Sequence, residues 1–172
     1  MESLLGLAKL SGHKNAIKLL RRARDVLPHD VRPYMVLASL FKSAGKAKRG
    51  KGALRQGVAA VRRFAAQKGT TDTMPRNLHA ALLADFGWES RESFQDGETA
   101  LTTLREAHTI DPYSPTIAVM LGVVLAEAGF GEDAVKLVLE LGARTNDLNE
   151  QYSRYAYEIR ALVEADSLEK EL

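Results

Sequence analysis

The clearest structural signal lies in residues 115–148, which read PTIAVMLGVVLAEAGFGEDAVKLVLELGARTNDL. Ser114 and Pro115 suit the start of a helix, because serine can cap free backbone amides and proline at the first position has no amide to satisfy. The second half carries apolar residues at steps of four and three, as one buried helix face requires: Ala134, Val138 and Leu141. Gly129 lies between the two parts. We therefore predict two helices joined by a turn at Gly129.

The spacing of this apolar stripe recurs in two earlier segments. In both, the steps of four and three residues are followed by a proline five residues later: Ala16, Leu20, Ala23 and Pro28, and then Ala100, Leu104, Ala107 and Pro112. The stripe that starts at Ala134 lies 34 residues after the one that starts at Ala100. Repetition at a fixed period is typical of solenoids, in which each unit buries its apolar face against its neighbours.

The first helix of each unit shows a related pattern. Five positions recur there with the same spacing. In one unit they are Ala118, Leu121, Gly122, Leu125 and Gly129, and in another they are Tyr34, Leu37, Ala38, Phe41 and Gly45. Together with the stripes, this pattern resembles the tetratricopeptide repeat, although Ala118 and Leu125 are not the usual aromatic residues. The resemblance implies an all-α superhelical solenoid of about four helix-turn-helix repeats with a C-terminal capping helix. A plain helical bundle is the alternative.

The resemblance divides the chain into four units and a cap. We expect repeats at 1–30, 31–67, 76–114 and 115–148, the first without its opening residues, a capping helix at 149–165 and an acidic tail at 166–172. The second repeat has three extra residues near Gly45 to Gly52, which we interpret as a basic, glycine-rich loop. The third has about five extra residues between Trp88 and Gly97. Glycines are expected to end helices at four positions: Gly45, Gly69, Gly129 and Gly142.

Composition and charge narrow the classes of function. The 172 residues include no cysteine, which excludes disulfides, thiolate metal sites and cysteine nucleophiles, and no apolar run approaches the length of a membrane span. We expect a soluble protein of the cytoplasm or of an organelle interior, without a signal peptide. Residues 1–71 hold 16 Lys and Arg against 3 Asp and Glu, whereas residues 72–172 hold 8 against 19. The net charge of +2 therefore hides a basic half and an acidic half.

Basic residues are concentrated between Asp30 and Asp72, where no acidic residue occurs. Such a segment can contact phosphates, with an affinity that falls steeply with salt. The candidate polyanion-binding residues are Lys46, Lys48, Arg49, Lys51, Arg55, Arg62 and Arg63. The aromatic residues of this segment, Tyr34, Phe41 and Phe64, fall at positions expected to be buried, so stacking on nucleic-acid bases is poorly supported.

Catalytic and metal motifs are weak in this sequence. Gly45, Gly50 and Lys51 have the spacing of a phosphate-binding loop, but Gly52 replaces the serine or threonine that would hold magnesium, and no strand precedes it. The histidines are dispersed and lack the pairing of a metal site: His13, His29, His79 and His108. The carboxylates lack an apolar setting that would prepare them for acid–base chemistry. We expect no enzyme activity, no metal and no cofactor.

Partners of tetratricopeptide solenoids bind the concave face that the first helices line. By resemblance, this face presents Arg32, Met35, Val36, Ser39, Lys42, Asn77, Ala84, Trp88, Val119, Met120, Val123 and Glu127. Its apolar members suit a bound peptide, unless the terminal helix folds back over them and makes them core. The carboxylate clamp of heat-shock co-chaperones is rejected, because its positions carry none of the required residues; they are Met1, Leu5, Val36, Asn77 and Ala81.

Three hypotheses of function follow. The favoured one is a non-catalytic scaffold or adaptor that holds a protein or peptide within a larger assembly. In the second, the basic half binds RNA or another polyanion. In the third, the basic end of one molecule meets the acidic end of the next, which gives head-to-tail self-association.

Overall fold

The computed structural model describes residues 12–28, 30–66, 75–145, 157–161 and 164. Every regular element in this part of the chain is helical. The helices are α2 (His13–Val26), α3 (Arg32–Ser43), α4 (Ala47–Ala66), α5 (Arg76–Phe94), α6 (Gly97–Ile110), α7 (Pro115–Glu127) and α8 (Gly131–Thr145). The predicted all-α class is confirmed.

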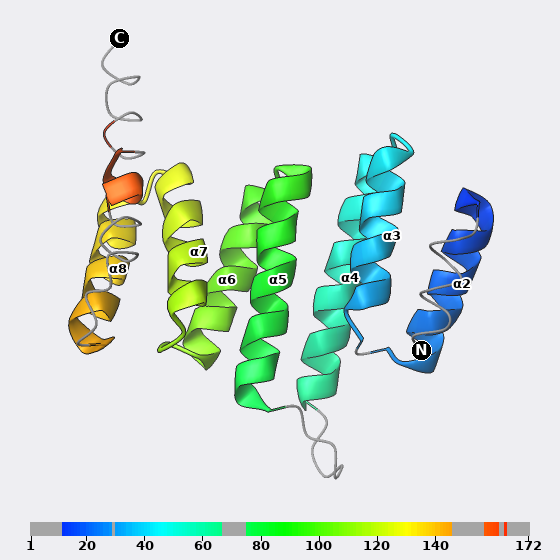
Figure 1. Cartoon of the computed structure of the whole chain (residues 1–172), viewed down its shortest axis with the longest axis horizontal. Coiled ribbons are helices and arrows are strands. Elements are labelled where there is room, and N and C mark those ends of the chain that lie inside the picture. The colour runs from blue at the N-terminus through cyan, green and yellow to red at the C-terminus, as the bar shows by residue number, and fades with distance from the viewer. Residues whose placement is uncertain (1–11, 29, 67–74, 146–156, 162–163, 165–172) are drawn as a thin grey trace.

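The helices form a row of antiparallel pairs in two layers (Figure 1). Each helix packs against the next one along the chain, and α5 also packs against both α3 and α7. Between α4 and α6, by contrast, long arginine side chains reach across: Arg55 lies 3.1 Å from Asp96, and Arg62 pairs with Glu106. We call the layer of α3, α5 and α7 the inner layer, because its helices lie closer together. This arrangement is a helical-repeat solenoid and not a bundle around one centre.

Small side chains set the separation between the paired helices. All nine residues of the three predicted stripes are at most 4% exposed: Ala16, Leu20, Ala23, Ala100, Leu104, Ala107, Ala134, Val138 and Leu141. Glycine permits closer contact still, since a Cβ on Gly57 of α4 would lie 2.3 Å from the Phe86 ring of α5. A Cβ on Gly87 of α5 would lie 2.9 Å from Leu104 of α6. The stripes are therefore the contact surfaces that the sequence indicated.

Local chemistry fixes several helix ends. Ser114 caps α7 and accepts a hydrogen bond from the Ile117 amide at 3.5 Å, and Pro115 is the first helical residue, as predicted. Gly45 and Gly129 follow α3 and α7 with φ of +70° and +83°, a conformation that glycine adopts without strain. The predicted stop at Gly142 is wrong, because α8 continues to Thr145. Gly69 lies outside the described residues.

The expected basic loop between Gly45 and Gly52 does not exist. The turn after α3 is short, and α4 already begins at Ala47, so Gly50 and Gly52 are helical. Gly50 is needed there because a Cβ at this position would meet the ring of Phe94 at 2.4 Å. The extra residues of the second repeat therefore lengthen α4 to 20 residues. The extra residues after Trp88 likewise lengthen α5, which runs to Phe94.

The end of the solenoid is covered in part by residues 157–161, which are helical. Ile159 is 1% exposed, and its side chain lies 2.9 Å from where a Cβ on Gly122 of α7 would be. Apart from Glu164, the rest of the predicted capping helix lies outside the described residues, as does the predicted acidic tail. No helix among those described has the length and apolarity to cross a membrane.

Two glycines of α4 allow the packing argument to be tested. We expect Gly57→Ala to destabilise the protein by about 1–3 kcal/mol, because the added methyl group overlaps the fully buried Phe86 ring. Gly52→Ala in the same helix meets nothing within 4 Å and should stabilise the protein by about 0.5–1 kcal/mol through helix propensity. Urea unfolding monitored by circular dichroism measures both. Equal effects of the two substitutions would contradict close packing at Gly57.

Candidate functional site

The inner helices can be aligned through one small residue in each. Ala38 of α3, Gly87 of α5 and Gly122 of α7 all lie where their helix approaches its partner most closely. A Cβ on Gly87 would meet Leu104 and Ala100 of α6, and a Cβ on Gly122 would meet Val138 and Ala134 of α8. In the first pair the contact is seen from the outer helix: a Cβ on Gly50 of α4 would lie 3.0 Å from the Ala38 carbonyl oxygen. Residues at the same offset from these three positions therefore occupy equivalent places on the inner layer.

The predicted apolar residues of the inner layer are neither fully exposed to solvent nor fully buried. All five are half-buried: Met35, Val36, Val119, Met120 and Val123. Met35, Val36, Met120 and Val123 also pack against the edge of the core. Trp88 of α5 is half-buried as well. Ile159 packs at Gly122, on the side of α7 that faces α8. We call the accessible side of α3, α5 and α7 the inner face.

The other residues predicted for the concave face differ in their exposure and in their partners within the protein. Ala84 is 3% exposed and belongs to the core. Asn77 lies in the first turn of α5, where its side chain accepts a hydrogen bond from the Leu78 amide at 2.9 Å. Arg32 is exposed but binds Asp30 at 2.7 Å. Ser39 and Lys42 are exposed on α3, as is Glu127 on α7.

Arg91 joins the inner helices α5 and α7 and is not among the residues predicted from the sequence. Its Nε donates a hydrogen bond to Glu127 at 2.7 Å, and its guanidinium lies 4.7 Å from the centre of the Trp88 ring. The hydrogen bond to Glu127 raises the pKa of Arg91, and Glu92 lies beside it. The cation that stacks on Trp88 is thus neutralised by carboxylates of the protein itself, and the cluster holds the tryptophan in place.

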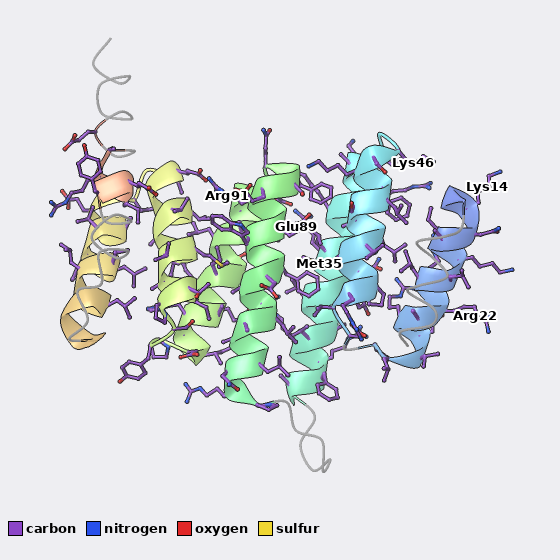
Figure 2. All side chains as sticks on the ribbon, viewed as in Figure 1. Lys14, Arg22, Met35, Lys46, Glu89 and Arg91 are labelled. Carbon is purple, nitrogen blue, oxygen red and sulfur yellow. The ribbon has the colours of Figure 1, made fainter. Side chains whose placement is uncertain are left out.

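Two carboxylates interrupt the apolar character of the inner face. Asp85 and Glu89 lie on α5 one turn apart, and Figure 2 shows Glu89 near the seam with α3, where Met35 also lies. The equivalent residues are apolar in the other two helices, Val36 and Leu40 in α3 and Met120 and Val124 in α7. Neither carboxylate has an ion-pair or hydrogen-bond partner among the described residues. Partial desolvation raises the pKa of Asp85, although its side chain remains exposed.

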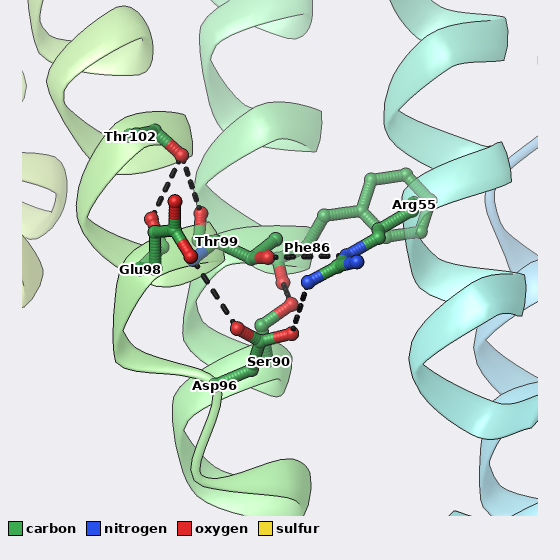
Figure 3. A network of polar contacts seen from close by, with 7 residues as sticks. All are labelled: Arg55, Phe86, Ser90, Asp96, Glu98, Thr99 and Thr102. Carbon is green, nitrogen blue, oxygen red and sulfur yellow. Dashed lines mark hydrogen bonds and ion pairs between the residues drawn. The ribbon is translucent and has the colours of Figure 1, made fainter. Parts of the chain in front are cut away.

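Two of the predicted polyanion-binding residues are engaged within the protein. Arg55 donates to Asp96, the capping residue of α6, at 3.1 Å and to Thr99 at 3.4 Å (Figure 3). Arg62 donates through Nε to Glu106 at 2.9 Å. Both therefore serve to connect α4 with α6. The sequence could not separate these arginines from the others, because their partners lie more than 40 residues away.

The remaining basic candidates lie at the start of α4 and on its outer side. Lys46, Lys48 and Arg49 are exposed, Lys51 is half-buried, and Arg63 is exposed with a hydrogen bond to the Ala59 carbonyl. The structure adds a row of exposed basic residues on α2, opposite its buried stripe: Lys14, Lys18, Arg21 and Arg22. Figure 2 labels Lys14 and Arg22. None of these four is paired with a carboxylate among the described residues.

The histidines do not form a metal site within the described residues, where no group of three or more potential ligands occurs. His79 of α5 is half-buried, and its Nε2 is enclosed without a hydrogen-bond partner. Desolvation lowers the pKa of His79; Glu106 of α6 opposes this shift, and Arg62 of α4 reinforces it. His79 thus belongs to the packing around the Arg62–Glu106 pair.

The comparisons with known proteins reveal a shared fold. No protein-family model and no curated protein sequence matches the chain. It is similar in structure to MamA AMB-1 in a primitive orthorhombic crystal form, with a TM-score of 0.54 and 20% identity over 95% of this chain and 89% of that one. A C-centred form gives 0.49 and 18% over 95% and 88%, and a point mutant of MamA gives 0.48 and 18% over 95% and 87%. The first of these similarities supports the fold of a helical-repeat solenoid.

His79 gives a prediction for the pH dependence of stability. Because folding lowers the pKa of His79 below 6.5, the unfolded chain binds the proton more tightly, and the stability should fall as the pH drops below about 6.5. His79→Gln cannot titrate and should remove this component. Urea unfolding of both proteins at about pH 7.5 and about pH 5.5 checks it. Parallel losses of stability in the wild type and the variant would contradict the assignment.

Proposed function

We propose that the protein is a non-catalytic scaffold whose inner face binds a segment of another protein. The supporting observation is the row of half-buried apolar residues along α3 and α7, with Trp88 between them. Such side chains are sufficiently fixed by the core to form a defined surface and sufficiently accessible to contact a partner. Methionines at both ends, Met35 and Met120, can adapt their shape to different side chains.

The architecture supports this function as well. A solenoid presents one continuous face assembled from successive repeats, on which an extended or helical segment can lie across several helices. The Arg91–Glu127 ion pair holds two of these helices together at the face. Because the apolar residues are distributed over α3, α5 and α7, a bound segment would gain contacts with all three.

A pair of matched variants tests the proposal. Val36→Ser with Met120→Ser removes apolar surface from the inner face, whereas Val26→Ser with Leu139→Ser removes apolar surface from exposed positions elsewhere. We expect the inner-face variant alone to lose at least about tenfold in partner affinity, since each lost contact costs about 1 kcal/mol. Quantitative co-purification from the native extract, followed by titration of the partner found, measures this loss.

Circular dichroism and thermal unfolding establish that both variants remain folded. If the inner-face variant retains its partners while the outer variant loses them, binding occurs elsewhere and the proposal is wrong.

Polyanion binding is the second candidate, favoured by the basic row on α2, which has no carboxylate partner in the part of the chain that the structure describes. Like charges one turn apart on a helix destabilise it by about 0.2–0.5 kcal/mol per pair, so a bound anionic chain would relieve repulsion there. Lys46, Lys48 and Arg49 are further exposed cations at the start of α4. Tyr34 and Phe41 are buried, which leaves phosphate contacts without base stacking.

We expect Lys18→Gln, Arg21→Gln and Arg22→Gln together to reduce binding to a labelled RNA duplex by tenfold or more at low salt. Arg55→Gln with Arg62→Gln is the control, because these residues are already paired and should affect stability more than binding. Fluorescence anisotropy at increasing salt measures affinity. Light scattering in the same buffers tests the third hypothesis, for which salt-sensitive oligomers are required. Equal loss of affinity in the control would contradict a binding surface on α2.

A further inference from the structure

The inner face of α5 carries two acidic residues at places where the repeat has apolar ones. Asp85 replaces the residue equivalent to Val36 and Met120, and Glu89 replaces the one equivalent to Leu40. Both carboxylates belong to the face that also carries the half-buried apolar side chains; Glu89 is itself half-buried, and burial of its surroundings partly desolvates Asp85. Carboxylates in such a setting lose part of their hydration without gaining an interaction in return, which is unfavourable for the protein alone.

The neighbouring seam shows how the same architecture neutralises a carboxylate. Between α5 and α7, Arg91 reaches Glu127 and forms a two-point ion pair. The residue of α3 equivalent to Arg91 is Lys42, but its ammonium group lies 5.9 Å from the centre of the Phe94 ring and not beside a carboxylate. Glu127 therefore has a cation supplied by the protein itself, whereas Asp85 and Glu89 of α5 have none among the described residues.

The surroundings of the two carboxylates limit what can neutralise them. The inner face carries Met35 and Val36 on α3, Trp88 on α5 and Val123 on α7, all half-buried. A simple cation would satisfy the charges but would leave this apolar surface in water. A peptide that carries positive and apolar side chains would neutralise the carboxylates and also cover the apolar surface.

We propose that the inner face binds a cationic amphipathic segment of a partner protein, with lysine or arginine side chains at Asp85 and Glu89 and apolar side chains against Met35, Val36 and Trp88. The proposal rests on the proposed function of this face. Asp85 and Glu89 are four residues apart, about 6 Å along the helix, which matches cations one helical turn apart in the ligand. Charge-assisted contacts would favour binding, because ion pairs at a partly desolvated site are stronger than those at an open surface.

The single tryptophan of the chain, Trp88, provides a reporter within the proposed site. The probe is an amphipathic helical peptide of leucine and lysine, about 14 residues or four turns long, and its counterpart has glutamate in place of lysine. We expect the lysine peptide to shift the Trp88 emission and the glutamate peptide to leave it unchanged. The affinity for the lysine peptide should decrease with salt, and it should decrease in acid as Asp85 becomes protonated.

Two isosteric double variants separate the site from overall charge. Asp85→Asn with Glu89→Gln should reduce the affinity for the lysine peptide at least tenfold. Glu132→Gln with Asp133→Asn removes the same charge from exposed positions on α8 and should leave the affinity within about twofold, as expected for screened charges outside the site.

Equal losses in both variants, or tighter binding of the glutamate peptide, would overturn the cationic specificity while leaving the inner face as the proposed binding surface. If the Val36→Ser and Met120→Ser variant captures its partners undiminished, the proposed function itself fails, whatever the peptides show.

Discussion

The structure depends on close contact between helices at positions where side chains are small. Gly57 accommodates the Phe86 ring between two repeats, and Gly87 and Gly122 allow each inner helix to approach its outer partner. Larger residues at these sites would push the helices apart and remove the burial of the alanine and leucine stripes beside them. Because each contact involves only adjacent helices, the packing of one pair does not depend on distant pairs, and the inner face follows from their stacking.

The two layers are held at different separations by different interactions. Inner helices pack directly on one another, while arginine side chains bridge the outer helices α4 and α6. Exposed ion pairs of this kind contribute only about 0.2–1 kcal/mol each. The apolar stripes therefore stabilise the solenoid, and the arginine bridges set how the outer helices are oriented. This division explains why basic residues of the first half need not all be available to an external anion.

Much of the fold could be predicted from the sequence because the signals are local and repeated. The stripe at Ala134, Val138 and Leu141 has copies elsewhere, and the Ser114–Pro115 start depends only on neighbouring residues. Helix length was harder to predict, because a glycine can end a helix or can lie inside one where a neighbouring helix leaves no room for a side chain. Gly50 is helical because the Phe94 ring occupies the space of its side chain, a contact between residues 44 positions apart.

The candidate site could be predicted only in part, for a related reason. The apolar residues of α3 and α7 follow from the register of the repeat, but Asp85, Glu89 and Arg91 require the alignment of Gly87 with Gly122, which the longer α5 obscures in the sequence. Once aligned, the three inner helices differ at the same positions: apolar in α3 and α7, acidic in α5. Such exchanges alter the chemistry of one face, while the contacts of Gly87 and Gly122 with the outer helices lie on another side of each inner helix. The repeat thus allows the specificity of its inner face to change without any change in fold.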